Sequence, residues 1–229
     1  MKKTLLLTSV VALVLLASTL PSGAQETLPA CRASVRTIDD CPVEGCGAGG
    51  DGPLNRMKNR TEQPSDPEEQ TLGFIRRLRQ PRSWTTGQDR SSIAETEARA
   101  VVVTAILQDA RASGSETVNC KLRGRANNDF HLDLASFRND PRARSVAAEI
   151  TPRLRPDGWT FPKLNAIGEQ KRFVRVTGWL MLDTQHIRSP LVRSTNWEIH
   201  PVTKLEVCTL TVTRCRQGDG WVALEDFEL

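Results

Sequence analysis

Alternating apolar and polar positions mark two half-buried β-strands in the second half of the chain. In the segment TNWEIHPV, Trp197 and Ile199 face one side while Glu198 and His200 face the other, because successive side chains of a strand point in opposite directions. The segment FHLDL, which begins at residue 130, repeats the pattern and places its histidine and aspartate together. These patterns predict a sheet that buries one face in a core and carries imidazole and carboxylate groups on the other.

The same periodicity predicts the other elements of the second half. Strands are expected over 101–107, 129–134, 145–151, 173–182 and 196–208, with a helix over 161–168 between the third strand and the fourth. This order is typical of the OB fold, a small five-stranded Greek-key barrel. We therefore expect an all-β protein with minor α content and an OB-like barrel over residues 98–208. A hairpin or tail should follow over 209–229, and an extra short strand is expected near Cys120.

The region 25–97 lacks this regular pattern. It contains the glycine-rich run 44–53, several prolines and few β-branched residues, which predicts an irregular extension. Residues 54–60 could form one or two helical turns. Leu72, Ile75 and Leu78 recur at helical spacing before Pro81, which predicts a short amphipathic helix.

The first residues have the pattern of an export signal. Lys2 and Lys3 precede an apolar run over 5–16 and small residues at 22–24, which predicts a signal peptide over 1–24 and a periplasmic or secreted protein. An uncleaved signal retained as an anchor is the alternative. After cleavage no segment is long enough for a membrane span.

Charge and cysteine content narrow the function classes. The chain has 31 basic and 27 acidic residues, and cleavage would remove Lys2 and Lys3 and no acid, leaving 29 against 27. Such a balanced surface does not favour non-specific nucleic-acid binding. An even number of cysteines in an exported chain favours disulfides of open connectivity over a metal site at Cys41 and Cys46. The six cysteines are Cys31, Cys41, Cys46, Cys120, Cys208 and Cys215.

Several of these segments carry a resemblance to a protein group. The segments FHLDL, AEI at 148–150, VRVTG at 174–178 and WEIHPV at 197–202 resemble a group of uncharacterised bacterial exported proteins, and LRQPRSWT at 78–85 is similar to their lead-in. The resemblance covers roughly residues 70–208. It implies the OB-like barrel and transfers no activity, cofactor or site residue.

The predicted barrel brings four ionisable residues to one face. Its second strand neighbours the third, and the third neighbours the fifth, so residues on these strands should meet on the outer surface. They are His131, Glu149, Glu198 and His200.

Three interpretations of this polar cluster are open. In the first, it is a structural network in which Glu149 and Glu198 pair with a lid that carries Arg56, Lys58 and Arg60. In the second, a metal site binds zinc or another divalent metal and could support a metal-dependent hydrolase, such as a phosphodiesterase or nuclease. Its ligands would be His131, Glu149 and His200. In the third, the face binds a ligand such as an oligosaccharide, a protein or a single-stranded nucleic acid.

The remaining histidine offers a weaker alternative. His186 lies in the loop after the fourth strand with Asp183 three residues earlier, and the two could form a dyad, although a solvated histidine is the simpler interpretation. The sequence as a whole favours a non-catalytic, exported, OB-like binding or structural module of unknown ligand, without a cofactor.

Overall fold

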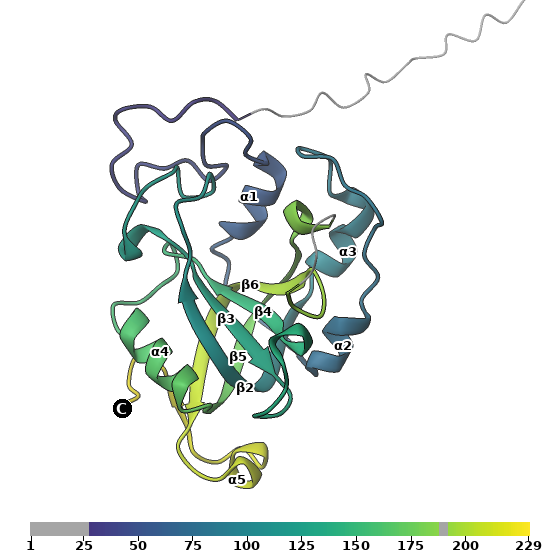
Figure 1. The fold of residues 1–229 in the computed structure, drawn as a ribbon, viewed down its shortest axis with the longest axis vertical. Coiled ribbons are helices and arrows are strands. Elements are labelled where there is room, and N and C mark those ends of the chain that lie inside the picture. The colour runs from purple at the N-terminus through teal and green to yellow at the C-terminus, as the bar shows by residue number, and fades with distance from the viewer. Residues whose placement is uncertain (1–27, 188–191) are drawn as a thin grey trace, which may run out of the picture.

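The computed structural model describes residues 28–187 and 192–229 and is mostly β (Figure 1). The predicted signal peptide lies outside the described residues. None of the helices in the described ranges is long and apolar enough to cross a membrane.

Five strands form a closed barrel. They are β2 (Ala100–Ala112), β3 (Phe130–Ala135), β4 (Val146–Ile150), β5 (Phe173–Leu182) and β6 (Trp197–Cys208). Neighbours follow the order β2-β3-β4-β6-β5, and pairing of β5 with β2 closes the ring. All pairings around the ring are antiparallel except that of β4 with β6, which is parallel. The predicted five-stranded barrel in a mostly β protein is therefore confirmed.

The barrel interior holds the apolar half of each alternating pattern. Leu132, Ile150 and Ile199 are completely buried, as are Val103 and Val176 on the two strands that close the ring. Helix α4 (Phe161–Glu169) packs against β2 and adds its buried apolar side chains to the same core. The predicted helix between the third and fourth barrel strands is thus present.

Two short strands extend the sheet beyond the barrel. Strand β1 (Glu68–Gln70), within a stretch expected to be irregular, runs parallel to β2. Strand β7 (Trp221–Ala223) pairs antiparallel with β6 after helix α5 (Val212–Arg216), so a hairpin forms the C-terminal end. The expected strand near Cys120 is not formed, because the chain turns there and both Cys120 and Lys121 adopt positive φ angles.

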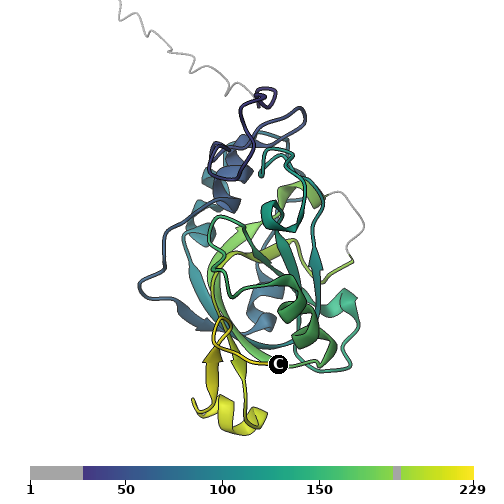
Figure 2. The same ribbon diagram turned by 90° about the vertical axis from the view of Figure 1, so that its left-hand side faces the viewer.

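The N-terminal region is irregular, as expected, and its described part contains three short α-helices besides the 3-10 turn Ser91–Ile93. They are α1 (Gly52–Lys58), α2 (Leu72–Arg77) and α3 (Ala94–Glu97). Asp51 begins α1 by accepting a hydrogen bond from the backbone N–H of Leu54, a typical N-cap. Helix α1 lies at the end of the molecule opposite the C-terminal hairpin (Figures 1 and 2).

All six cysteines form disulfides, as predicted. Cys31 pairs with Cys46, Cys41 with Cys120, and Cys208 with Cys215. The first two bridges hold the N-terminal region together and attach it to the loop between β2 and β3. The third closes the C-terminal hairpin.

Candidate functional site

The structure brings the four residues of the polar cluster together on the outer face of β3, β4 and β6. His131 and Glu149 are directly opposed across β3 and β4, and His131 Nδ1 lies 3.1 Å from Glu149 Oε1. His200 Nδ1 lies 3.1 Å from Glu149 Oε2 and 3.3 Å from Glu198 Oε1. The carboxylate of Glu149 therefore lies between two imidazoles.

This face of the sheet is covered. Glu198 and His200 are 0% exposed and Glu149 is 2% exposed, whereas the His131 side chain is 26% exposed. Buried ionisable groups need partners of opposite charge or hydrogen bonds.

The partners differ from those expected of an N-terminal lid. Glu198 pairs with Arg193, whose Nη1 lies 3.0 Å from Glu198 Oε2. Lys58 Nζ lies 3.3 Å from Glu116 Oε2. Neither cluster glutamate makes a direct ion pair with Arg56, Lys58 or Arg60 among the described contacts, because Glu149 lies against His131 and His200 and Glu198 against Arg193. Of the predicted lid, Lys58 still acts on Glu149 through its charge.

The other two cations of the predicted lid are also engaged elsewhere. Arg56 lies 3.6 Å from Glu44. Arg60 donates hydrogen bonds to the backbone carbonyls of Leu180 and His200, and so attaches the chain after α1 to the edges of β5 and β6.

Electrostatics favour charged imidazoles in the cluster. Burial alone would lower the pKa of His200, but Glu149, Glu198 and Asp129 raise it to about 9. Burial also opposes the charge on His131, yet Glu149 and Glu116 raise the pKa of this imidazole above its usual value. The cluster can therefore hold protonated histidines at neutral pH.

The two cluster glutamates differ in their electrostatics. Burial alone would raise the pKa of Glu149, but His131, Lys58 and His200 hold it well below the usual value. Burial and the nearby Glu149 raise the pKa of Glu198. The charge on Glu149 is therefore well compensated, whereas the charge on Glu198 is costly.

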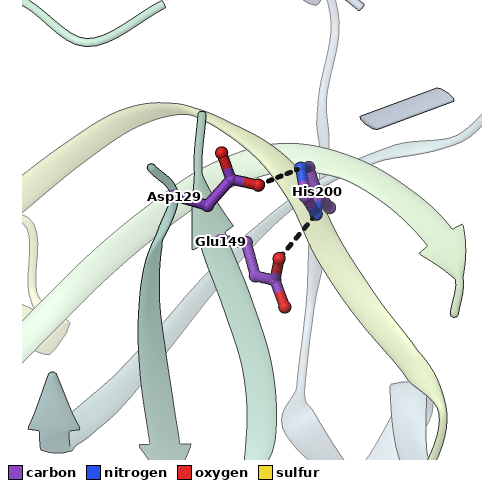
Figure 3. Close-up of side chains that lie close together, drawn as sticks. All are labelled: Asp129, Glu149 and His200. Carbon is purple, nitrogen blue, oxygen red and sulfur yellow. Dashed lines mark ion pairs between the residues drawn. The ribbon is translucent and has the colours of Figure 1, made fainter. Parts of the chain in front are cut away.

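Asp129 is a site residue that the sequence interpretation missed. It precedes β3, is 1% exposed, and places Oδ2 3.8 Å from His200 Nε2 (Figure 3). Its other oxygen accepts a 2.9 Å hydrogen bond from Asn119 Nδ2. The alternation could have revealed it, because Asp129 has the same parity as His131 in the strand pattern.

The ligand atoms that could share a metal ion come from Asp129, Glu149 and His200. One atom from each lies within 4.8 Å of the other two, and this is the one such group of three among the described residues. In this candidate ligand set, Asp129 stands in place of His131, which the sequence interpretation had grouped with Glu149 and His200.

A cleft of about 510 Å³ opens over the polar face. His131 and Glu149 line it from the sheet, Gly49 and Lys58 from the N-terminal region, and other side chains from the loop after β2 and the segment after β5. Its charged side chains comprise five basic groups, two imidazoles and four carboxylates. They are Lys58, Arg111, Lys121, Arg142, Arg193, His131, His186, Glu116, Asp133, Glu149 and Asp183.

The Asp183–His186 pair is present in this cleft. His186 Nδ1 lies 2.5 Å from Asp183 Oδ2, and the His186 side chain is 58% exposed. The hydrogen bond with Asp183 and the charge of that carboxylate raise the pKa of His186. Asp133, another carboxylate of the cleft, is held by Arg111 and Arg142.

Comparison of the chain with protein-family models, with curated proteins and with solved structures finds no match.

Proposed function

We propose that the protein is an exported, non-catalytic OB-like binding module that takes a small anionic ligand in the cleft over its polar sheet face. The observation that carries the proposal is the convergence of five basic side chains, from separate parts of the chain, on one cleft of about 510 Å³. That volume lies in the range of small-molecule sites, about 300–1,000 Å³.

The acids of the cleft already have basic partners. Glu116 lies beside Lys58, and Asp183 beside Arg193 and His186. Asp133 is held by two arginines, of which Arg142 uses Nε at 2.9 Å. A guanidinium has five N–H donors, so Arg142 keeps donors for a ligand even while it holds Asp133.

Spare donors suit a ligand rich in acceptor oxygens. Carboxylate and phosphate groups accept charge-assisted hydrogen bonds from arginine in planar, paired geometry. The protonated imidazoles of the cluster add to the positive field. An anionic ligand of a few carboxylate or phosphate groups therefore fits the cleft best.

The covered face argues against a long polymer. Ligand oligomers of OB folds lie along an open barrel face, whereas here side chains from α1, from the loop after β2 and from residues 183–186 and 192–193 line a cleft over that face. A short ligand is accordingly favoured over an oligosaccharide or a single-stranded nucleic acid.

Export is supported by the cysteines. Three disulfides and no free thiol fit an oxidising compartment such as the periplasm or the cell exterior. Detection of a mature chain that begins near residue 25 in a periplasmic or culture fraction would support export. Retention of the full chain in the cytoplasmic fraction would contradict it.

The hydrolase alternative is less well supported. A catalytic metal keeps one coordination position open to water and substrate. Of the three residues that could share an ion, Glu149 lines the cleft, whereas Asp129 and His200 do not. We therefore favour binding over hydrolysis.

Binding can be tested with citrate and inorganic phosphate as probes, measured by calorimetry and by thermal shift. We expect citrate to bind and to raise Tm, and Arg142→Gln to weaken citrate binding about tenfold, since one charge-assisted contact contributes roughly 1.5 kcal/mol. Arg214→Gln is the matched control, because Arg214 is similarly exposed but lies on the C-terminal hairpin.

Three outcomes would contradict the proposal. The first is that neither citrate nor phosphate binds to the wild-type protein. The second is that citrate binds to Arg142→Gln as tightly as to wild type. In the third, a ten-nucleotide single strand could bind with steep salt dependence while citrate did not, which would favour a polymer ligand.

A further inference from the structure

Among the buried polar atoms that have no hydrogen-bond partner within the described part of the chain, one belongs to each residue of the group in Figure 3. They are Asp129 Oδ2, His200 Nε2 and Glu149 Oε2, of which Glu149 Oε2 keeps its 3.1 Å charge contact with His200 Nδ1. The 3.8 Å gap between Asp129 Oδ2 and His200 Nε2 is too long for a hydrogen bond. Leaving such atoms without a hydrogen bond in a buried position costs free energy, so an occupant would stabilise the site.

The surrounding contacts orient these atoms. Asn119 donates to Asp129 Oδ1 at 2.9 Å, which directs Oδ2 toward His200. His200 Nδ1 lies 3.3 Å from Glu198 Oε1, so this nitrogen keeps its proton, and a metal ion bound at Nε2 would displace the second proton of the charged imidazole. A carboxylate behind a histidine and a hydrogen-bonded carboxylate ligand are the usual outer contacts of a metal site.

We propose that Asp129, Glu149 and His200 bind one divalent transition-metal cation, with Zn²⁺ as the best fit. Zinc bonds to imidazole nitrogen and carboxylate oxygen are about 2.0–2.2 Å long, so two of them reach across the gap between Asp129 and His200. One ligand atom of each residue lies within 4.8 Å of the others. A nitrogen ligand favours zinc over the oxygen-seeking Mg²⁺ and Ca²⁺.

The site is structural. Its three residues are at most 2% exposed, so a bound ion would be closed off from the cleft solvent. The ion would join three separate elements, since Asp129 precedes β3, Glu149 lies on β4 and His200 on β6. Asn119 is also next to Cys120, which is bridged to Cys41, so the N-terminal region is fixed to the same point.

This inference does not depend on the proposed ligand of the cleft. Citrate binding is tested at Arg142, which does not belong to the metal group, and metal binding is tested with zinc alone. Either result can fail without the other.

The experiment measures zinc binding to the purified protein after chelator treatment and dialysis, by calorimetry and elemental analysis. We expect one zinc per chain in wild type, a Tm that rises with zinc, and a loss of affinity of at least 100-fold in Asp129→Asn. His186→Ala is the control and should retain full affinity, because His186 is outside the group.

The ligand set is tested by a further variant. His131→Ala should keep stoichiometric zinc with a loss of about 10–100-fold, smaller than that of Asp129→Asn, because His131 contacts the ligand Glu149 without belonging to the group. A loss as large as that of Asp129→Asn would overturn this ligand set in favour of one that includes His131.

Asn119→Ala tests the metal site if Asp129→Asn does not fold. It leaves all three ligands in place and should weaken zinc binding about 10–100-fold through Asp129. Absence of zinc binding in wild type, or unchanged zinc affinity in Asn119→Ala and in any folded Asp129→Asn, would show that a proton alone fills the gap.

Discussion

His200 Nδ1 lies 3.1 Å from Glu149 Oε2, and both side chains are almost completely removed from solvent. The pair joins β6 to β4 at the one parallel pairing of the barrel, where Ala148 is registered with Ile199. Each member of this buried pair has a further partner of opposite charge. His131 lies next to Glu149, and Glu198 lies next to His200. The stability of the fold is therefore linked to the charges of the cluster.

Glutamine variants of the two cluster glutamates should differ in their effect on stability. Glu149→Gln leaves His131 and His200 without their shared acid and should lower the free energy of unfolding by about 3–5 kcal/mol. Glu198→Gln should cost less, because burial and Glu149 already disfavour the charge on Glu198. Thermal melts in the presence of chelator measure both, and equal melting temperatures for wild type and Glu149→Gln would contradict the network.

Lys58 should be essential to the N-terminal attachment. The Lys58 side chain is 7% exposed and pairs with Glu116, so Lys58→Met would leave this partly exposed carboxylate with His131 as its remaining positive neighbour and should cost about 1–3 kcal/mol. Lys121→Met is the matched control, because Lys121 lines the same cleft and is exposed. Urea denaturation compares the two, and equal midpoints would argue against a structural role for Lys58.

Because of the Lys58–Glu116 pair, the free energy of unfolding should also fall at acid pH. Burial alone would raise the pKa of Glu116, but Lys58 and His131 lower it to about 2. A lowered folded-state pKa contributes stability that is present above the unfolded value, about 4.3, and is lost as pH falls toward 2. Glu116→Gln should flatten the dependence of Tm on pH between about 5 and 2, and an unchanged slope would contradict the assignment.

The pKa of His186 should report the Asp183 pair directly. Asp183 favours the protonated imidazole, so the His186 resonance in an NMR titration should give a pKa above 6.5. Asp183→Asn should return it toward that value. The pair's contribution to stability is present below about pH 6.5 and is lost as pH rises through the folded-state pKa. It should be under about 1 kcal/mol, because the imidazole is more than half exposed.

The disulfide that closes the longer loop should contribute more to stability, because loop-closure entropy grows with the logarithm of loop length. Cys41 and Cys120 are 79 residues apart and Cys208 and Cys215 are 7 apart. Loop entropy gives about 4.5 kcal/mol for the first bridge and about 2.5 kcal/mol for the second. Paired serine variants of each bridge, compared by thermal melts, should follow this order, and the reverse order would contradict the entropic account.

The sequence by itself determined where two barrel strands lie and which of their side chains share a face. Alternation along 130–134 and 195–202 was sufficient to assign β3 and β6 and to place His131, Glu198 and His200 on one face. This succeeds because the side-chain period of a strand is a local property of the backbone and needs no knowledge of distant residues. The helix over 161–168 was predictable because the 3.6-residue side-chain period of a helix is likewise a local property of the backbone.

Only the tertiary structure decided which charges meet. Arg193 pairs with Glu198, Lys58 with Glu116, and Asp129 faces His200, although nothing in the local pattern of these segments assigns these partners. The cysteine count predicted disulfides but left fifteen possible pairings. Ion pairs and bridges form between segments far apart in the chain, and their identity depends on how the loops after β2 and β5 pack over the sheet. The sequence therefore specified the strands and their polar face, whereas packing selected the partners and created the cleft.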